Sequence, residues 1–205
     1  MSLRARLQSG KILVAPGAYD ALTARLLEQA GFEAVYRGGY AASAAAFALP
    51  DLGITTLTDM VDHARRMTSA ITVPVIADAD TGFAGDNGDT SACVQALESA
   101  GVAGIQIEDQ VSAKKCGLLE GKQLVSTKEM CARLTSAVRA RSNPALVLIA
   151  RTDARGVTGY DDALARARAY RQAGADMIFI EALHDAEEFQ RFARECPGPL
   201  LANMT

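Results

Sequence analysis

The sequence predicts an α/β fold, and within that class a (β/α)8 barrel that forms a single domain over residues 1–205. Short apolar segments alternate with segments of helical periodicity, and the apolar segments lack the polar alternation of a half-exposed sheet. Charged and amide side chains end one apolar segment after another. In a barrel the carboxyl ends of all strands meet at one rim, so these side chains would share one site there.

Seven apolar segments are the predicted strands. Three of them repeat one pattern, in which an Ala-Gly pair ends a helix and an apolar run follows. The seven segments cover residues 11–18, 30–36, 73–80, 100–108, 143–154, 173–181 and 198–205. Helices are predicted between them, near residues 20–30, 57–70, 89–100, 126–141, 160–173 and 185–195.

A doubly wound sheet would show the same alternation of strands and helices. Its strand ends would spread along a line, however, and no GxGxxG motif follows the first predicted strand. A complete barrel has eight strands and about 250 residues. We therefore expect this chain to lack the eighth strand and the C-terminal helices, which the complete protein would supply.

The composition argues against several classes of function. A net charge of −3, two histidines and no tryptophan give no basic face for nucleic acid and little material for a histidine-rich metal site. No apolar run approaches the ~20 residues that span a bilayer, and the N-terminus lacks the apolar centre of a signal peptide. We therefore expect a cytoplasmic protein that binds neither nucleic acid nor membrane. The four cysteines have no zinc-site spacing.

Acidic residues at neighbouring strand ends predict a divalent metal site. Asp78 and Asp80 are two residues apart, so both side chains lie on one side of a strand end, and Glu108 ends the next strand. Carboxylates gathered this closely need a cation to stay ionised, and oxygen ligands suit Mg²⁺ or Mn²⁺. Helix capping or loop solvation would explain a single acid, but the set favours the metal.

Arg151 ends the strand that follows. Its planar guanidinium suits bidentate recognition of a substrate carboxylate. An ion pair with Glu181 or Asp153 is the alternative. The two roles are compatible, because an arginine oriented by Glu181 would be preorganised for substrate.

Cys116 lies in the loop after the strand that ends at Glu108. Lys114 and Lys115 precede it, and nearby ammonium groups favour the reactive thiolate. Gly117 allows the loop to change shape, as closure over a bound substrate requires. A surface cysteine among ordinary lysines is the alternative, but the position after an acid-tipped strand favours a catalytic role.

Together these residues resemble the isocitrate lyase / phosphoenolpyruvate mutase superfamily. The matching motifs are APGAYDALTA (15–24), PDLGITTL (50–57), ADADTGF (77–83), IEDQ (107–110), KKCG (114–117), ARTDA (150–154) and ANMT (202–205). They extend over nearly the whole chain. The resemblance implies a (β/α)8 TIM barrel, Mg²⁺, a small-molecule carboxylate substrate of the 2-oxo or 2-hydroxy acid type, and a homotetramer or dimer that exchanges a terminal helix between neighbours.

The resemblance also implies roles for the residues that match its motifs. Asp78 and Asp80 would hold the metal, and Glu108 and Asp51 would orient its water ligands. Tyr36 matches a tyrosine near the reacting hydroxyl, and it would be catalytic together with Glu108 and Cys116. The substrate-binding residues would be Gly38, Gly39, Tyr40, Cys116, Gly117, Arg151, Glu181, Asn203, Met204 and Thr205.

The KKCG motif favours a lyase within this superfamily. Its lyases cleave a carbon–carbon bond in a retro-aldol sense, giving a 2-oxo acid and a carboxylate that must be protonated. A cysteine in a lysine-rich loop can supply that proton, and the mutases typically lack it. Leu118 in place of the usual His, and Gly38 in place of the usual Ser, separate the chain from methylisocitrate lyase itself. The Gly39-Tyr40 pair and the LEGK sequence (119–122) after the loop are more similar to the branch named for carboxyvinyl-carboxyphosphonate phosphorylmutase, oxaloacetate decarboxylase or dimethylmalate lyase.

The leading hypothesis is a Mg²⁺-dependent lyase acting on a 2-hydroxy (or 2-alkyl-2-hydroxy) di- or tricarboxylate. Three alternatives stay open. An oxaloacetate decarboxylase would use the same pocket without needing Cys116. A P–C bond mutase or hydrolase would share the metal site, and a non-catalytic protein would bind an oxo acid without turnover.

Overall fold

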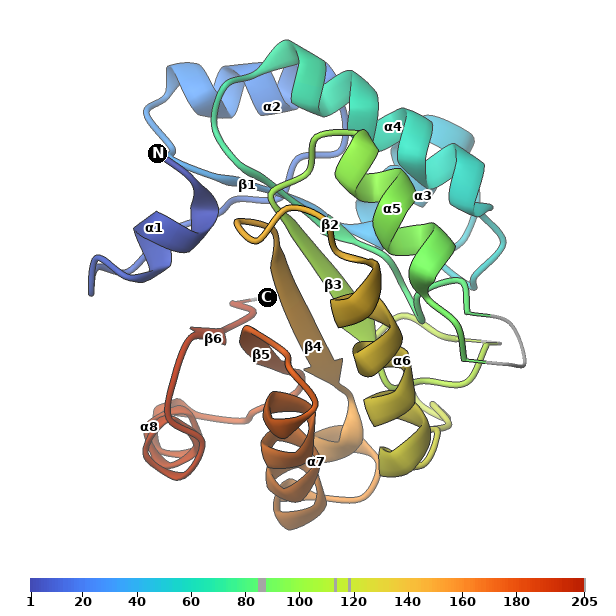
Figure 1. Ribbon diagram of the computed structural model, residues 1–205, viewed down its shortest axis with the longest axis vertical. Helices are drawn as coiled ribbons and strands as arrows, with labels where there is room; N and C mark the ends of the chain where they lie inside the picture. Colours follow the sequence, from blue (N-terminus) through green and yellow to red (C-terminus); the bar gives the residue numbers. More distant parts are fainter. Residues whose placement is uncertain (85–87, 113, 118, 205) are drawn as a thin grey trace.

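The computed structural model describes residues 1–84, 88–112, 114–117 and 119–204. These residues form one curled sheet of six parallel strands, in which each strand pairs with the next one along the chain (Figure 1). The strands are β1 (Val35–Arg37), β2 (Val75–Asp78), β3 (Gly104–Glu108), β4 (Val147–Thr152), β5 (Met177–Ile180) and β6 (Leu200–Leu201). Strands that follow in chain order around a curl form a half-barrel, so the predicted α/β class and its barrel-like arrangement are confirmed.

All six predicted helices are present. They are α2 (Ala21–Gln29), α4 (Leu57–Ala70), α5 (Ser91–Ser99), α6 (Thr127–Ala140), α7 (Tyr160–Gln172) and α8 (Ala186–Glu195). Side-chain caps begin several of them; Asp20, for example, accepts a hydrogen bond from the Thr23 amide at 2.7 Å. The repeated Ala-Gly pairs end three of the helices, because Gly31, Gly101 and Gly174 have the positive φ that glycine tolerates.

Among the residues that the structure describes, three short elements were not predicted: the helices α1 (Leu3–Leu7) and α3 (Gly39–Phe47) and the 3₁₀ helix η2 (Ala154–Gly156). The α3 sequence is mostly alanine and has no polar face, so helical periodicity does not reveal it. The α1 and η2 segments are too short for a periodic pattern.

The strand predicted over residues 11–18 is wrong. Within this segment one parallel bridge joins Gly17 to Tyr36, and it uses hydrogen bonds from the Ala18 amide to the Tyr36 carbonyl and from the Tyr36 amide to the Pro16 carbonyl. Pro16 has no N–H group with which to extend the ladder. Further back, Ile12 is 95% exposed, so the apolar run that suggested a strand is not buried here.

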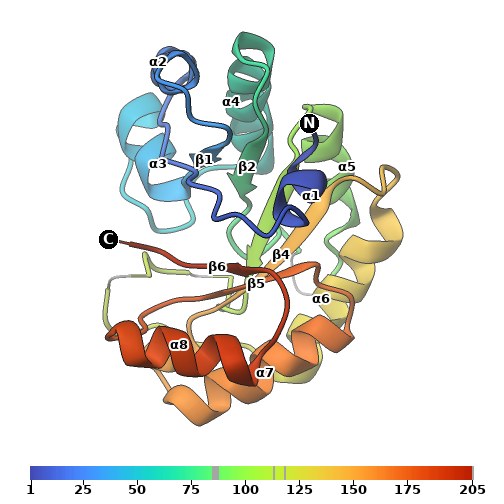
Figure 2. The ribbon, with the colours of Figure 1, turned by 90° about the vertical axis from the view of Figure 1, so that its left-hand side faces the viewer.

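The apolar core of the described residues has three clusters, one of which lies between α2, α4 and the start of the sheet and includes Ala24, Val35 and Met67. The largest cluster lies between the sheet and the outer helices α4 to α8, whereas the third lies on the inner face and includes Ile149, Met177 and Phe179. Helix α1 closes this inner face with the fully buried Leu3 (Figure 2). Gly104 makes room for it, because a Cβ there would lie 2.9 Å from a Leu3 methyl carbon.

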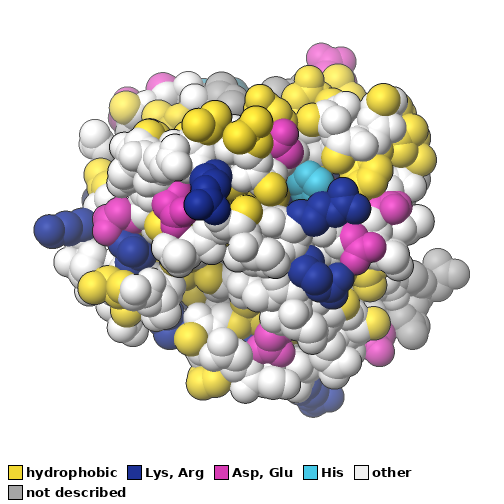
Figure 3. Space-filling view, turned by 90° about the horizontal axis from the view of Figure 1, so that it is seen from above, with side chains coloured by type: hydrophobic (Ala, Val, Ile, Leu, Met, Phe, Trp, Pro, Cys, Tyr) yellow, Lys and Arg dark blue, Asp and Glu magenta, His cyan; other side chains and the backbone are white. Residues whose placement is uncertain are grey.

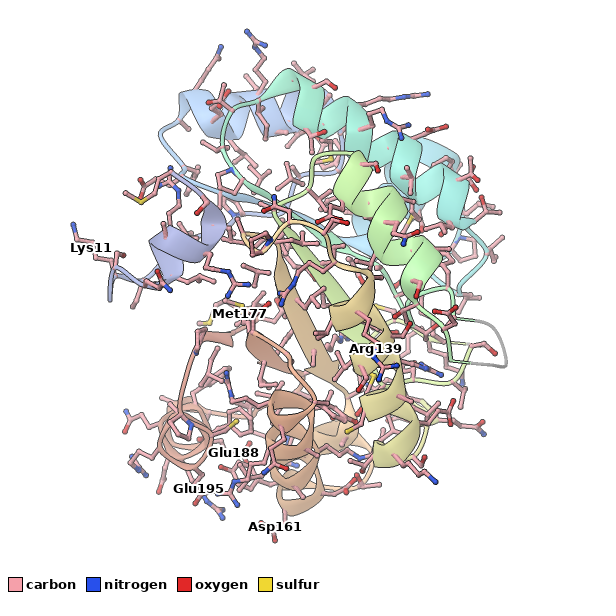
Figure 4. All side chains as sticks on the ribbon, viewed as in Figure 1. Lys11, Arg139, Asp161, Met177, Glu188 and Glu195 are labelled. Carbon is pink, nitrogen blue, oxygen red and sulfur yellow. The ribbon has the colours of Figure 1, made fainter. Side chains whose placement is uncertain are left out.

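Met177 illustrates the inner face in Figure 4, where its side chain lies near α1, whereas Arg139 and Asp161 lie on the outside of their helices. On the face seen in Figure 3, lysine and arginine side chains are interspersed with acidic and apolar ones. Among the described residues, no helix has both the length and the apolar character needed to span a membrane.

The two-residue period of the strands explains how the inner face becomes polar at its rim. Val147 and Ile149 belong to the inner core, so Arg151, two residues further along β4, lies on the same face. The same rule places Asp78 after the inner residue Ile76. The strand register sets Glu108 beside Arg151, so acids and arginine are brought together at the carboxyl ends of the strands.

Candidate active site

Asp78 and Asp80 form the acidic pair at the end of β2. The Gly39 amide, in the first turn of α3, donates to Asp78 Oδ2 at 3.1 Å, and the Asp80 amide donates to Asp78 Oδ1 at 3.0 Å. A helix N-terminus favours a carboxylate in this position. Asp80 has a φ of 48°, a left-handed conformation that costs energy for a residue with a side chain.

A side chain at position 39 would crowd the acidic pair. A Cβ there would lie 3.0 Å from Asp78 Oδ2 and 3.2 Å from Asp80 Oδ1, so both carboxylates converge on the space that a side chain would fill. Gly38 is the N-cap residue of α3. Tyr40 follows in the helix, and its side chain is 65% exposed rather than turned into the acidic cluster.

The Lys114 ammonium lies against this acidic cluster. Its Nζ is 2.6 Å from Asp80 Oδ1 and also pairs with Asp51 Oδ1, and the lysine side chain is almost completely buried. Burial raises the pKa of Asp80 to about 6, and the Asp78 charge adds to this effect while Lys114 opposes it. The Lys114 ammonium therefore partly neutralises the carboxylates of Asp51 and Asp80.

Arg151 joins the acids of three neighbouring segments. Its guanidinium donates to both carboxylate oxygens of Asp153, at 3.0 and 3.2 Å, and lies 3.3 Å from Glu181 and 3.5 Å from Glu108. It also lies over the ring of Phe179. The ion-pair alternative is thus present, and the arginine is held in one orientation at the rim. Burial raises the pKa of Glu108 well above its ordinary value, while Arg151 opposes the shift.

The KKCG loop reaches the same cluster through Gly117. A Cβ at this position would lie 2.0 Å from Arg151 Nη2, so a larger residue could not be accommodated against the guanidinium. Cys116 is half-buried beside it. The two lysine ammonium groups have other partners, since Lys114 pairs with the acids and Lys115 Nζ lies 3.4 Å from the Glu120 carbonyl. Stabilisation of a Cys116 thiolate by these lysines stays a prediction.

The remaining predicted residues differ in how far they are buried and in the part of the rim to which they belong. The Tyr36 hydroxyl donates to Gln106 Oε1 inside the curl of the sheet, and burial raises its pKa well above the ordinary value. Asn203 donates to Glu181 Oε2 at 3.4 Å, so it belongs to the Arg151 side of the rim. Met204 is 86% exposed, and Thr205 lies outside the described residues.

A cavity of about 550 Å³ opens beside this part of the rim. It is lined by Gly117, Leu119, Glu120, Gly121, Lys122, Gly156, Val157, Ile180, Glu181, Ala182, Leu183, Phe189 and Asn203. Three predicted substrate-binding residues therefore line it, while Asp78 and Asp80 are buried outside its lining.

Sequence reasoning missed two buried residues of the site. Arg37 ends β1 and is fully buried; it donates to the Asp78 carbonyl at 2.8 Å and to His63 Nδ1 at 3.2 Å. A charged residue that ends an apolar strand was a usable signal for it. Gln110 closes the IEDQ motif and contacts Lys115 and Asp153, but no pattern in the sequence indicates those contacts.

The donor atoms at the rim suit a hard divalent ion. Asp80 Oδ1 and Glu108 Oε1 are buried and accept no hydrogen bond from the described residues, although Asp80 Oδ1 is paired with Lys114. In the parts of the chain that the structure describes, no three His, Cys, Asp or Glu side chains converge closely enough to hold a metal as they stand. The oxygen-only donor set fits Mg²⁺ or Mn²⁺ with water as additional ligands.

Comparisons with known proteins show the family to which the chain belongs. The family model described as phosphoenolpyruvate phosphomutase matches residues 3–205. The chain is 48% identical to 2,3-dimethylmalate lyase of Eubacterium barkeri, covering 98% of this chain and 70% of that protein. It is 49% identical to 2-methylisocitrate lyase of Aeropyrum pernix, covering 99% of this chain and 65% of that protein. The chain thus spans about two thirds of the length of these relatives.

Solved structures are similar over the same extent. A crystal structure of 2,3-dimethylmalate lyase, described as a PEP mutase/isocitrate lyase superfamily member, gives a TM-score of 0.94 at 41% identity and covers 99% of this chain and 69% of that one. Oxaloacetate acetylhydrolase with 3,3-difluorooxalacetate gives a TM-score of 0.93 at 36% identity, covering 98% and 70%. The predicted superfamily is confirmed, and the chain belongs to the phosphoenolpyruvate phosphomutase family within it.

Proposed function

We propose that the protein is a Mg²⁺-dependent lyase that cleaves a carbon–carbon bond of a 2-hydroxy (or 2-alkyl-2-hydroxy) di- or tricarboxylate. The observation that carries this proposal is the close approach of Gly117, the neighbour of Cys116 in the KKCG loop, to Arg151, which also pairs with Glu108 at the rim. Relatives named 2,3-dimethylmalate lyase and 2-methylisocitrate lyase support it. Mn²⁺ is the alternative ion, since the same oxygen donors suit it.

Asp78, Asp80, Glu108 and Asp51 are the residues that would hold the ion, directly or through water. When bound, the divalent ion supplies Lewis-acid stabilisation of the negative charge that develops on the oxygens of the 2-oxo acid product. A crystal structure of a related phosphonopyruvate hydrolase was obtained with oxalate and Mg²⁺. That pair has the chemistry expected here, a small dicarboxylate together with a hard cation.

The chain's own groups then divide the remaining work. Arg151, fixed by Asp153 and Glu181, binds a substrate carboxylate. Tyr36, which burial keeps protonated, would exchange its bond to Gln106 for one to the reacting hydroxyl oxygen, and Glu108 would accept the proton that this hydroxyl loses. The Cys116 thiol donates a proton to the carbon of the departing carboxylate product, and the loop around it excludes water.

Product analysis tests this proposal. The protein is incubated with Mg²⁺ and, in turn, 2,3-dimethylmalate, 2-methylisocitrate and oxaloacetate, and the 2-oxo acid and its co-product are identified. We expect one hydroxy acid to yield a 2-oxo acid and a carboxylate in equal amounts, and excess chelator to abolish the reaction. Release of CO₂ from oxaloacetate alone would instead indicate a decarboxylase, and absence of turnover would indicate a binding protein.

We also propose that the active protein is a cytoplasmic homo-oligomer, either a dimer or a tetramer. The support is the family resemblance, in which neighbouring subunits exchange a terminal helix. Light scattering measures the oligomeric state, and a fully active monomer would contradict the proposal.

A further inference from the structure

Gln110 connects the cysteine loop to the core of the site. Its side chain is buried directly after the acidic end of β3. The carboxamide Nε2 donates to the Lys115 carbonyl at 3.0 Å, and Oε1 accepts from the Lys115 amide at 2.9 Å. Both main-chain groups of the residue before Cys116 are therefore bound by one side chain.

The same carboxamide also reaches the residue that orients Arg151. Its Nε2 lies 3.2 Å from Asp153 Oδ2, and Asp153 receives two hydrogen bonds from the Arg151 guanidinium. Arg151 in turn lies against Gly117, the residue that follows Cys116. Gln110 thus binds Lys115, the residue before Cys116, directly, and it is linked to Gly117, the residue after Cys116, through Asp153 and Arg151.

The backbone of Gln110 is fixed independently of its side chain. The buried Arg133 donates to the Gln110 carbonyl at 3.0 Å, and the ends of the loop are joined by a bridge between Gln110 and Leu124. A side chain on a fixed backbone loses little further freedom when it binds, so it can hold a loop in one position.

We propose that Gln110 is a positioning residue, which sets the Cys116 thiol relative to the Arg151 guanidinium. This role rests on the proposed function, in which the two groups act on one substrate. Only a side chain with both a donor and an acceptor can bind both main-chain groups of Lys115. Glutamate would lose the donor and place a carboxylate against Asp153, and methionine would lose both.

The test measures the reactivity of Cys116 without any substrate. Wild type, Gln110→Met, Gln110→Glu and the matched control Gln123→Met are treated with iodoacetamide, and alkylation is followed by peptide mapping. Gln123 lies in the same loop, but its side chain is exposed and its recorded contact is a main-chain one. Cys131, which is also half-buried, serves as the internal reference thiol.

We expect iodoacetamide to alkylate Cys116 about fivefold faster, or more, in both Gln110 variants than in wild type. The reason is that a loop released from its buried hydrogen bonds opens more often. Cys131 should react at the wild-type rate, and Gln123→Met should match wild type at both thiols. In the active protein, kcat should also fall by about 10- to 100-fold, the scale on which misplaced groups slow catalysis.

An unchanged Cys116 rate in a folded Gln110 variant would overturn the proposal. If Gln110→Met fails to fold, both thiols react faster, and Gln110→Glu then decides, because it keeps the volume and the acceptor for the Lys115 amide. The alkylation result does not depend on the reaction. Faster alkylation in a protein that cleaves none of the tested acids would therefore refute the proposed function and leave the positioning role intact.

Discussion

Asp80 combines burial, a neighbouring carboxylate and a left-handed backbone, and its protonation should control metal binding. Its pKa is raised to about 6, so the carboxyl holds a proton below that pH and is ionised above it. A proton and a cation compete for the same oxygen atoms, and affinity for Mg²⁺ should therefore fall by about tenfold per pH unit below pH ~6. Calorimetric titration at pH 5 and 7.5 measures this, and equal affinities would contradict it. Asp80→Asn should weaken binding and flatten its pH dependence.

Lys114 should stabilise the metal-free fold. Its buried ammonium pairs with Asp51 and Asp80, so Lys114→Met leaves two buried carboxylates without that charge. We expect the free energy of unfolding to fall by about 3 kcal/mol, the usual cost of breaking a buried ion pair. Lys115→Met is the control, because its ammonium contacts one exposed carbonyl and its loss should cost less than ~0.5 kcal/mol. Denaturant unfolding with chelator present measures the free energy of unfolding of both variants, and equal values would refute this account.

The sequence predicts single residues well where strand geometry fixes them. Asp78, Glu108 and Arg151 end strands, and the two-residue period places each on the inner face whatever the rest of the chain does. It does not predict which partners those residues choose. The contacts of Lys114 with Asp51 and Asp80 join segments far apart in the chain, and nothing local encodes them.

At the scale of elements, the start of helix α3 is part of the site, and Gly39→Ala tests this. The added methyl group would crowd Asp78 Oδ2 and Asp80 Oδ1, so we expect Mg²⁺ affinity to fall at least about tenfold. The helix itself should be retained, because alanine is a better helix former than glycine. Gly38→Ala is the matched control, since its Cβ would meet only the Tyr36 ring, at 3.8 Å. Calorimetry measures the Mg²⁺ affinity of both variants, and circular dichroism checks their helix content. Equal Mg²⁺ affinities would contradict the prediction.

Helix α1 should stabilise the half-barrel without taking part in the site. Leu3 is fully buried against the inner core, so Leu3→Ala should lower the free energy of unfolding by about 2–5 kcal/mol. Leu22→Ala, at an exposed position on α2, should change it by less than ~0.5 kcal/mol. Denaturant unfolding compares the two variants, and equal stabilities would show that α1 is not part of the cooperative core.

The elements that the sequence predicts are those with a strong local pattern. The six outer helices are amphipathic or capped, and strands β2 to β5 are buried and mainly apolar up to the polar residues near their carboxyl ends. The segment 11–18 has the composition of a strand but is not one, because strand formation also requires a pairing partner and Pro16 limits the ladder. Helix α3 is the opposite case, a helix that lacks the pattern of one.

At the scale of the whole molecule, the curl of the sheet is what makes a site from scattered residues. Strands in chain order direct their carboxyl ends to one rim, and the loops after β2, β3 and β4 meet there. Arg151, the acidic cluster and the cysteine loop therefore come from different elements, and the proposed reaction needs all three. The central claim is that this rim cleaves a carbon–carbon bond with Cys116 as the proton donor.

The most direct test of that claim is the rate at which Cys116→Ala releases the 2-oxo acid. It is measured beside wild type, with Mg²⁺ and the hydroxy acid that wild type cleaves fastest. No described contact joins the half-buried Cys116 side chain to Asp78 or Asp80, so the variant should fold and bind Mg²⁺ and oxalate as wild type does. We predict that cleavage slows at least ~100-fold, the scale of a positioned general acid. Cleavage at a rate close to that of wild type, in a variant that still binds Mg²⁺ and oxalate, would contradict the account.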